Sequence, residues 1–427
     1  MTRRLLPLIL LIGLVASACS SGLVPSSTND EDPSTNDSNP SDDGQSRTAP
    51  DAPDTTGGAQ FDRSSADVII EAQPDHGALA QYPWPTDWTR RTVEDWNEFQ
   101  PGLRSRDPRD GIPPIDGPIF ETTALAGEWI GPREPGALVQ VDGEARFYPL
   151  SILTRHEIVN DTFGDVPVAV TFCPLCNTAI AFDRRINGAV LRFGVSGLLR
   201  NSDLVMWDSA TTSLWQQITG EGVVGEYAGA KLDSVATSIV SFSQFAEQFP
   251  DGKSLSGEGG FGRRAYGVNP YSNYSSSDRP FLFNDEIDDR LPALSRVVGV
   301  TEGDGLASYS FARLETERAI NDIVGDQPVV VLFAGDTADA LDDRAIATSQ
   351  AIGSGVAHSS VVDGETLTFA ANSDGSFTDA ETNSTWSILG IATDGELVGT
   401  QLEPVQHRNE FWFAWQAFFG PESLREA

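Results

Sequence analysis

Two cysteines separated by two residues, Cys173 and Cys176, are the only closely spaced side chains in this sequence that are both strongly nucleophilic and able to bind metal. The single other cysteine, Cys19, lies near the N-terminus. The pair lies between two apolar runs, residues 166–172 and residues 178–182. A Cys-Pro-Leu-Cys turn between two buried strands allows three kinds of chemistry: a disulfide, a redox dithiol or a metal site.

The first two interpretations use the sulfur atoms alone. A structural disulfide suits an oxidising, exported setting, although closing so short a loop contributes only roughly 2 kcal/mol of chain entropy. A redox dithiol relies on a thiolate of lowered pKa, and thioredoxin-like proteins obtain it by placing the motif at a helix N-terminus. Residues 178–183 alternate like a strand, so the sequence predicts no such helix.

The third interpretation is a metal site. Cys-Pro-X-Cys followed by Gly or Asn between two strands resembles the knuckle of rubredoxins and zinc ribbons. Structural zinc takes four ligands, usually with a second cysteine pair, and the sequence has no second pair. Two thiolates with one nitrogen or carboxylate, and an open position, suit a catalytic zinc, or copper because copper prefers soft ligands. We therefore predict zinc or copper as the cofactor of this turn.

His156 is the predicted third ligand or acid–base partner, because it precedes the strand that delivers Cys173. Its neighbour Glu157 is placed to orient it. The alternative for His156 is a capping or surface role on a helix. Asp161 is expected to end that helix, since its Asn-Asp pair recurs later in the chain. Three further histidines lack such support and are expected to be structural or exposed: His76, His358 and His407.

An internal repeat organises the sequence. Tyr148 recurs as Tyr309, 161 positions later, and the same offset relates Leu153 to Leu314 and Gly164 to Gly325. Further on, Trp215 is matched by Trp386. The second copy has residues 334–337, Ala-Gly-Asp-Thr, where the first has the cysteine turn, and Glu317 where the first has His156. The histidine and the cysteines are thus lost together, as expected if they act together.

The predicted fold class is α+β and β-rich, with two pseudo-equivalent units packed into one body. The first copy, residues 137–255, carries the cysteine turn, and the second, residues 296–427, is degenerate. A Trp-rich segment, residues 61–136, is expected to pack on the joined copies. Residues 256–295, rich in Gly, Tyr and Ser, are expected to form a connecting surface loop that overhangs a site.

Within the first copy, hydrophobic spacing and turn residues predict the individual elements. We expect a strand pair around 138–148, a helix over 150–159, a buried strand over 166–172 and a second helix over 242–249. The stretch from Ser196 to Asp203 has no evident counterpart at the same spacing in the second copy. Three of its residues are candidates to line a pocket, the alternative being a surface loop: Arg200, Asn201 and Asp203.

Several stretches of the first copy carry a resemblance to a known family. They are Phe-Tyr-Pro-Leu at 147–150, His-Glu-Ile-Val-Asn-Asp at 156–161, Phe-Cys-Pro-Leu-Cys-Asn-Thr-Ala at 172–179, and Ser-Gly-Leu-Leu at 196–199 through Asn-Ser-Asp at 201–203. This pattern resembles the family called domain of unknown function 3179, over most of the chain after about residue 110. The resemblance implies an exported or membrane-linked prokaryotic protein and brings no established activity. Asn177 stands where the family prefers Gly, a departure that a turn tolerates.

The N-terminus is typical of a bacterial export signal. Arg3-Arg4 precedes an apolar run too short to span a bilayer, and Ala-Ser-Ala precedes Cys19. We predict a signal peptide over residues 1–19 and a lipid-modified Cys19 that anchors the protein to the outer face of a membrane. An ordinary signal peptidase would accept the same site and leave a secreted protein. Residues 20–60, acidic and rich in Ser, Thr and Pro, predict a disordered tether.

The formal net charge of −34 argues against nucleic acid and against anionic lipid surfaces as partners. The sequence contains no Gly-rich phosphate loop, Ser-His-Asp order, paired zinc-ligand histidines or EF-hand spacing. It therefore names no substrate and no small-molecule or protein partner, and it leaves open whether the protein is an enzyme. The rival class is a structural or interaction lipoprotein in which the cysteine pair forms an inert disulfide.

Overall fold

Strands dominate the part of the chain that the computed structural model describes, residues 57–426. The fold is β-rich, with 38% strand against 14% helix, as the sequence predicts. None of the helices within residues 57–426 is both long enough and apolar enough to cross a bilayer. The predicted signal peptide with Cys19, and most of the predicted tether, lie outside the described residues.

The cysteine turn lies in a four-stranded sheet of order β16-β9-β8-β7. Its strands are β7 (Ile158–Phe163), β8 (Val166–Cys173), β9 (Thr178–Asp183) and β16 (Ser234–Val235). Cys173 pairs with Thr178, so residues 174–177 form the hairpin loop between β8 and β9. Asn177 closes this loop with a φ of 56°, in the left-handed region that Asn tolerates better than most residues. The predicted strands on both sides of the turn are confirmed.

A short helix precedes this sheet. The hairpin β5 (Pro135–Val141) and β6 (Glu144–Pro149) leads into α2 (Leu150–His156). The helix ends because Glu157 adopts a left-handed conformation with a φ of 58°. The prediction that the helix runs to residue 159 and ends at Asp161 is therefore wrong. Asp161 lies within β7, where it accepts hydrogen bonds from Tyr148 Oη and Arg146 Nη1, both at 2.5 Å.

A seven-stranded sheet of order β1-β2-β15-β14-β13-β12-β3 lies beside the cysteine hairpin. Its strands are β1 (Ile69–Ile70), β2 (Arg90–Arg91), β3 (Phe99–Pro101), β12 (Phe193–Arg200), β13 (Asp203–Asp208), β14 (Leu214–Gln216) and β15 (Glu221–Val224). The Trp-rich segment contributes three of these strands. Its Trp84 and Trp96 pack against Leu198 and Leu214.

A five-stranded sheet of order β17-β5-β6-β18-β4 completes the first half of the fold. Its remaining elements are β4 (Phe120–Thr122), α1 (Thr123–Ala126), β17 (Thr237–Ser241), α3 (Phe242–Gln248) and β18 (Lys253–Leu255). The helix α3 begins at a capping box, in which Ser241 and Gln244 satisfy each other's backbone N–H groups. The predicted helix over 242–249 is confirmed to within one residue.

The C-terminal part of the chain repeats this order of elements. It contains β19 (Arg296–Glu302), β20 (Gly305–Ser310), α5 (Phe311–Glu317), β21 (Ala319–Val324), β22 (Gln327–Ala334), β23 (Ser354–Ser359), β26 (Phe369–Ala371), β27 (Phe377–Asp379), β28 (Thr385–Trp386), β29 (Ala392–Asp394), β30 (His407–Phe411) and α6 (Trp412–Phe419). Its sheets have the orders β20-β19-β30, β21-β22-β23 and β26-β27-β28-β29. We call residues 135–248 the N-terminal stretch and residues 296–419 the C-terminal stretch.

Individual contacts also occur in both stretches. Asn160 exchanges two hydrogen bonds with the backbone of Phe193, and Asn321 does the same with Phe369. Asp208 accepts from the indole N–H of Trp215 at 3.0 Å, just as Asp379 accepts from that of Trp386 at 2.9 Å. Gly164 and Gly325 both have a positive φ, 54° and 59°, at the turns after β7 and β21.

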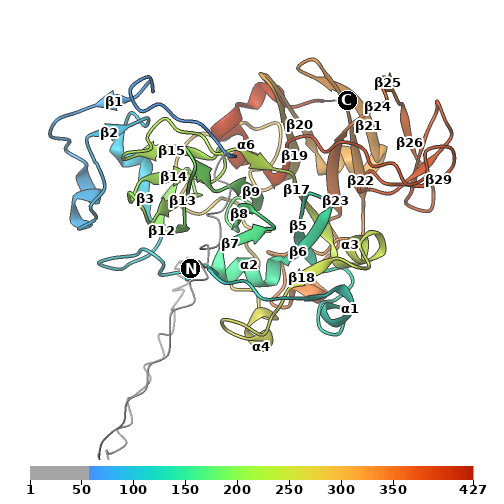
Figure 1. Ribbon diagram of the computed structural model, residues 1–427, viewed down its shortest axis with the longest axis horizontal. Coiled ribbons are helices and arrows are strands. Elements are labelled where there is room, and N and C mark those ends of the chain that lie inside the picture. The colour runs from blue at the N-terminus through green and yellow to red at the C-terminus, as the bar shows by residue number, and fades with distance from the viewer. Residues whose placement is uncertain (1–56, 427) are drawn as a thin grey trace, which may run out of the picture. The chain divides into compact units, whose positions relative to one another are not determined.

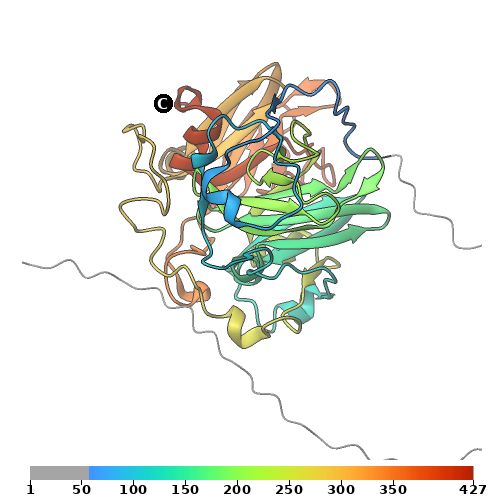
Figure 2. The ribbon, with the colours of Figure 1, turned by 90° about the vertical axis from the view of Figure 1, so that its left-hand side faces the viewer.

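The two stretches pack against each other through their last strands. β30 of the C-terminal stretch contacts β9 of the N-terminal stretch, and β17 of the N-terminal stretch contacts β23 of the C-terminal stretch. In Figures 1 and 2 the green strands therefore lie beside the orange and red ones. The backbone N–H of Phe411 in β30 donates to the carbonyl of Cys176 at 2.9 Å. The cysteine turn thus lies at the junction of the two stretches.

Candidate functional site

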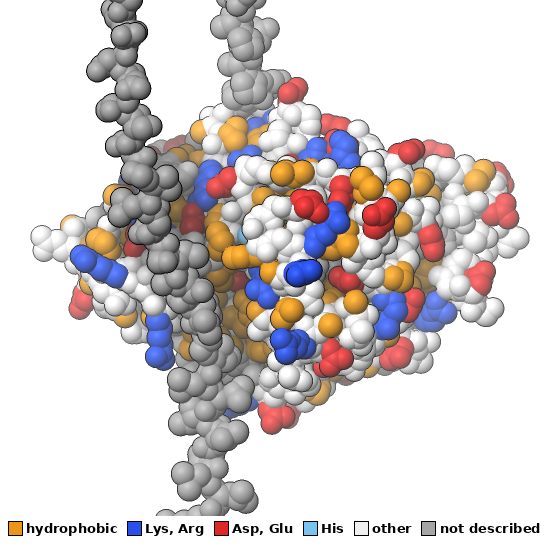
Figure 3. Space-filling model, turned by 90° about the horizontal axis from the view of Figure 1, so that it is seen from below, with side chains coloured by type: hydrophobic (Ala, Val, Ile, Leu, Met, Phe, Trp, Pro, Cys, Tyr) orange, Lys and Arg blue, Asp and Glu red, His pale blue; other side chains and the backbone are white. Residues whose placement is uncertain are grey.

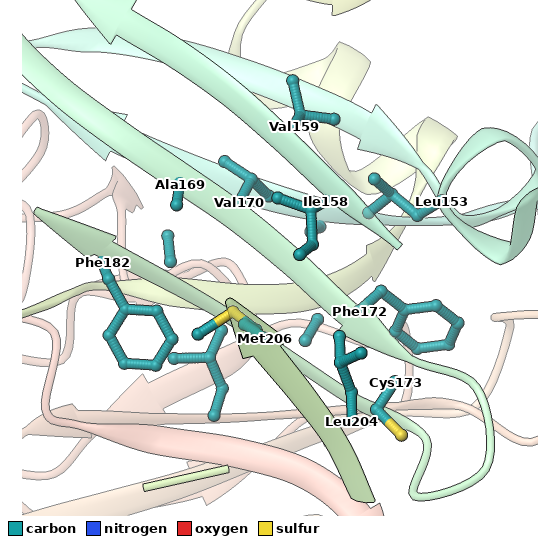
Figure 4. Close-up of a cluster of buried hydrophobic side chains, with 14 of the residues drawn as sticks. Leu153, Ile158, Val159, Ala169, Val170, Phe172, Cys173, Phe182, Leu204 and Met206 are labelled. Atoms are coloured by element: carbon teal, nitrogen blue, oxygen red, sulfur yellow. The ribbon is translucent and has the colours of Figure 1, made fainter. Parts of the chain in front are cut away.

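Three side chains with metal-binding atoms meet at this junction. The sulfurs of Cys173 and Cys176 and a carboxylate oxygen of Asp203 all lie within 4.8 Å of one another, and all three residues are buried. Cys173 is the last residue of β8, and Figure 4 shows its thiol at the margin of a hydrophobic cluster, beside Leu204. Asp203 is the first residue of β13. Strand ends from two different sheets deliver Cys173 and Asp203, and the hairpin loop between β8 and β9 delivers Cys176 to the same place.

Asp203 has one oxygen bound and one oxygen without a protein partner. Its Oδ2 accepts from Gln216 Nε2 at 2.6 Å and from the backbone N–H of Ile218 at 3.0 Å. Its Oδ1 is buried and has no hydrogen-bond partner among the described residues. Burial raises the pKa of Asp203 to about 6. Hydrogen bonding from the thiols of Cys173 and Cys176 opposes that rise, and a cation at this position would replace these weak S–H donors.

The two cysteines are free and buried, and burial favours their protonated form. Burial raises the pKa of Cys173, and it raises that of Cys176 well above the ordinary value. The neighbouring Asp203 acts in the same direction on both, because a second negative charge there is unfavourable. A bound metal ion has the opposite effect on the thiol pKa values, since a coordinating thiol loses its proton.

Two further buried carboxyl groups flank the cluster. Glu157, at the end of α2, accepts from the hydroxyl of Tyr271 at 3.2 Å. Glu410, on β30, accepts from Thr178 Oγ1 through Oε2 at 3.2 Å, and its Oε1 has no partner among residues 57–426. Burial raises the pKa of each of these two carboxyls to about 8. Burial therefore favours the protonated form of both carboxyls beside the thiols.

One cation accompanies these acids. Arg408 lies two residues before Glu410 on β30, is 6% exposed, and stacks over the ring of Phe419 at 4.8 Å. Its Nε and Nη1 are buried and have no hydrogen-bond partner among the described residues. Burial lowers the pKa of its guanidinium, and the charges of Glu410 and Asp203 oppose that shift.

Residues 256–295, which we call the cover segment, close the site from outside. The hydroxyl of Tyr274 donates to the carbonyl of Leu175 at 3.0 Å, and Ser202 Oγ donates to the carbonyl of Phe281. The segment contains one short helix, α4 (Arg263–Tyr266). Figure 3 views the side on which Figure 1 places α4, where hydrophobic, acidic and basic side chains are interspersed. Cys173 and Cys176 are only 1% and 0% exposed beneath the cover segment.

The structure does not place His156 in the cluster. Its Nδ1 donates to the carbonyl of Pro113 at 2.6 Å, and its Nε2 contacts the hydroxyl of Tyr266 at 2.8 Å. Both ring nitrogens are thus engaged by the loop before β4 and by α4. The prediction of His156 as the third ligand is corrected accordingly: the carboxylate of Asp203, from the candidate pocket stretch, lies in that place.

The sequence pattern of one protein family matches residues 109–423 of this chain. The chain belongs to that family, which is described as a protein of unknown function (DUF3179). The predicted resemblance is confirmed, and the matched region of this DUF3179 protein contains the cysteine turn, Asp203 and β30. No curated protein and no solved structure matches the chain.

The other two candidate pocket residues have structural roles in this DUF3179 protein. Arg200 donates to Glu98 Oε2 at 2.8 Å and to Gln216 Oε1 at 3.3 Å, so it supports the residue that holds Asp203. Asn201 lies in the hairpin between β12 and β13 with a φ of 51°. The stretch forms a strand and a tight hairpin, and the surface-loop alternative is wrong.

That hairpin has a counterpart in the C-terminal stretch, at a longer offset than the 161 positions that relate the earlier residues. Asn-Ser-Asp at 201–203 recurs as Asn-Ser-Asp at 372–374, because the offset lengthens from 161 to 171 positions between β7 and β13. Asp374 is exposed and accepts hydrogen bonds from Ser376, whereas Asp203 is fully buried. The environment, and not the motif, distinguishes the two aspartates.

Glu410 and Arg408 were not singled out from the sequence, although a signal was present. At an offset of 170 positions, β17 has Thr-Ser-Ile-Val at 237–240 where β30 has His-Arg-Asn-Glu at 407–410. Of these two strands, only β30, which packs beside the cysteine hairpin, therefore carries an arginine and a glutamate.

Proposed function

We propose that this protein binds a thiophilic divalent metal, zinc above all, through Cys173, Cys176 and Asp203. The observation that supports it is the convergence of two sulfurs with a buried, unpartnered carboxylate oxygen. Tetrahedral zinc with bonds of ~2.0–2.3 Å separates its ligand atoms by roughly 3.5–3.8 Å, which the 4.8 Å limit accommodates. Three protein ligands leave a fourth position for water or a substrate, the arrangement of a catalytic or ligand-exchanging zinc.

The raised thiol pKa values count against disulfide exchange by the metal-free pair. A dithiol that exchanges disulfides gains from a lowered thiolate pKa, whereas burial raises the pKa of both cysteines here. The residue after the turn begins a strand, so no helix dipole stabilises a thiolate. Copper is the alternative metal, because two thiolates are soft ligands.

We further propose that the two stretches are copies of one unit and that only the N-terminal one kept the ligands. The repeated Asn, Asp-Trp and Gly contacts support this. A cavity of about 10 Å³ at the junction also supports it, because residues at equivalent positions line it in pairs: Pro135 with Arg296, Leu150 with Phe311, and Ile239 with Asn409. On the sequence alone, we propose that Cys19 carries a lipid and holds this metal site on the outer face of a membrane.

Metal analysis of the full-length protein tests the proposal. The reduced protein is purified without chelators, and its zinc and copper are measured by mass spectrometry beside a thiol titration. The variants are Cys173→Ser, Asp203→Asn and His156→Ala, with Asp374→Asn as the matched control at the exposed counterpart. We expect one metal per chain in the wild type, His156→Ala and Asp374→Asn, none in Cys173→Ser, and an affinity at least roughly tenfold lower in Asp203→Asn.

Two results would overturn the metal proposal. Reduced wild-type protein that binds no metal, but shows a readily reducible disulfide when oxidised, would assign the pair to redox work. A disulfide that resists reduction, in a protein whose variants all fold and bind no metal, would favour a structural lipoprotein.

A further inference from the structure

The strand β30, which contacts β9 of the cysteine hairpin, differs in charge from its counterpart β17. β30 and β17 occupy equivalent places, each packed on the sheet of the opposite stretch. β17 presents Ser238 and Val240 where β30 presents Arg408 and Glu410. Alternate residues of a strand share a face, so Arg408 and Glu410 lie on the same side of β30. The charges are thus confined to the strand that lies beside the thiols.

Arg408 is a buried cation without a matching acceptor. Arg408 is only 6% exposed, and its Nε and Nη1 have no hydrogen-bond partner among residues 57–426. No carboxylate among those residues lies within ion-pair distance of it, and its guanidinium carbon lies 4.8 Å from the centre of the Phe419 ring. Isolated buried charges are strongly unfavourable unless an acceptor satisfies them. The guanidinium therefore has donors available for a group that is not part of the protein.

The unpartnered atoms of three residues indicate the chemistry of that group. Arg408 offers donors, whereas Asp203 Oδ1 and Glu410 Oε1 offer acceptors without donors. If Asp203 Oδ1 binds the metal, the guanidinium of Arg408 remains as an unpartnered donor group. A guanidinium beside an electrophilic metal selects a ligand with several negatively charged oxygens.

We propose that the fourth metal position takes a small oxyanion, a carboxylate or phosphate group, with one oxygen on the metal and another on Arg408. This inference rests on the proposed metal site. The ligand is small because the cover segment leaves the thiols 1% and 0% exposed. Arg suits such a ligand because its planar, permanently charged donors match carboxylate and phosphate geometry. Arg408 is then a binding residue for the anion and not a metal ligand.

Cobalt substitution tests the inference in the full-length protein. Co²⁺ bound by two thiolates absorbs visible light, and a change in its fourth ligand alters that spectrum. The cobalt protein is titrated with acetate and, separately, with inorganic phosphate, and the spectral change gives a dissociation constant for each. Arg408→Gln and Arg408→Lys are compared with Arg104→Gln, an exposed control with the same change of charge. Thermal melts confirm that each variant is folded.

We expect at least one of the two anions to change the wild-type spectrum in a saturable way. Arg408→Gln should bind one equivalent of cobalt and weaken the anion at least tenfold, Arg408→Lys should weaken it less, and Arg104→Gln should match the wild type. Cobalt uptake with no anion effect, or equal anion affinity in Arg408→Gln, overturns the inference and leaves the metal site standing. A wild-type protein that takes up no cobalt overturns the metal site and this inference together.

Discussion

Replacing Glu410 by Gln should stabilise the metal-free protein at neutral pH. Burial raises the pKa of this carboxyl to about 8 from its ordinary value of 4.5. The folded state then holds a proton that the unfolded state has lost at every pH between these values. The stability that wild type has below pH 4.5 therefore falls as the pH rises through 8. Gln cannot ionise, and its amide oxygen still accepts from Thr178, so the variant avoids that loss.

The size of the effect follows from the two pKa values. Each pH unit between 4.5 and 8 costs the wild type about 1.4 kcal/mol. Glu410→Gln should thus be more stable by about 3 kcal/mol at pH 7 and by less than about 1 kcal/mol at pH 5. The attraction between Glu410 and Arg408 is already contained in the pKa of about 8, so the gap grows with pH as stated.

Urea unfolding of reduced, chelator-treated protein between pH 5 and pH 8.5 measures this gap. Glu396→Gln is the matched control, because Glu396 is exposed, and its difference from wild type should not depend on pH in this range. A Glu410→Gln variant that is less stable than wild type at pH 7, or a gap that does not widen as the pH rises, would refute the reasoning.

Three other tests, with four variants, address separate parts of the structure. Burial lowers the pKa of His358 and His407 to about 4 from 6.5. Each histidine should therefore make the folded protein less stable by up to about 3 kcal/mol as the pH falls from 6.5 to 4. In urea titrations at acid pH, His358→Gln should remove the part of this loss that His358 causes. Tyr271→Phe removes a hydrogen bond between the cover segment and Glu157, so a thiol reagent should label the metal-free protein faster, and an unchanged rate would contradict the covering role. Asp208→Asn and Asp379→Asn weaken equivalent networks and should each lower the free energy of unfolding by roughly 2–3 kcal/mol; a difference of more than about threefold between them would contradict the duplication.

The sequence predicted those features that depend on neighbouring residues. Alternating apolar residues predicted β8 and β9, and the spacing of the cysteines placed both thiols in one hairpin loop. The pattern was misleading where a single backbone conformation decides the outcome. The helix α2 ends at Glu157 because that residue adopts the left-handed backbone conformation. A glutamate in the sequence does not predict a positive φ of 58°.

The third ligand position could not be predicted because it depends on long-range packing. Asp203 is 30 residues from Cys173 and reaches it only because two sheets meet at their strand ends. Its counterpart Asp374 is exposed with the same flanking motif, so composition alone does not separate them. Glu410 is more than 200 residues from the cysteines. It lies beside them because β30 packs on the sheet of the opposite stretch.

X-ray absorption at the zinc edge of the zinc-loaded, full-length protein tests the metal site most directly. The site described here predicts two sulfur neighbours at about 2.3 Å and oxygen neighbours at about 2.0 Å, without the outer-shell scattering of an imidazole ring. The Asp203→Asn variant should keep the sulfur shell and change the oxygen shell. A spectrum with four sulfurs, with imidazole scattering from a histidine, or with no sulfur at all would contradict coordination by Cys173, Cys176 and Asp203.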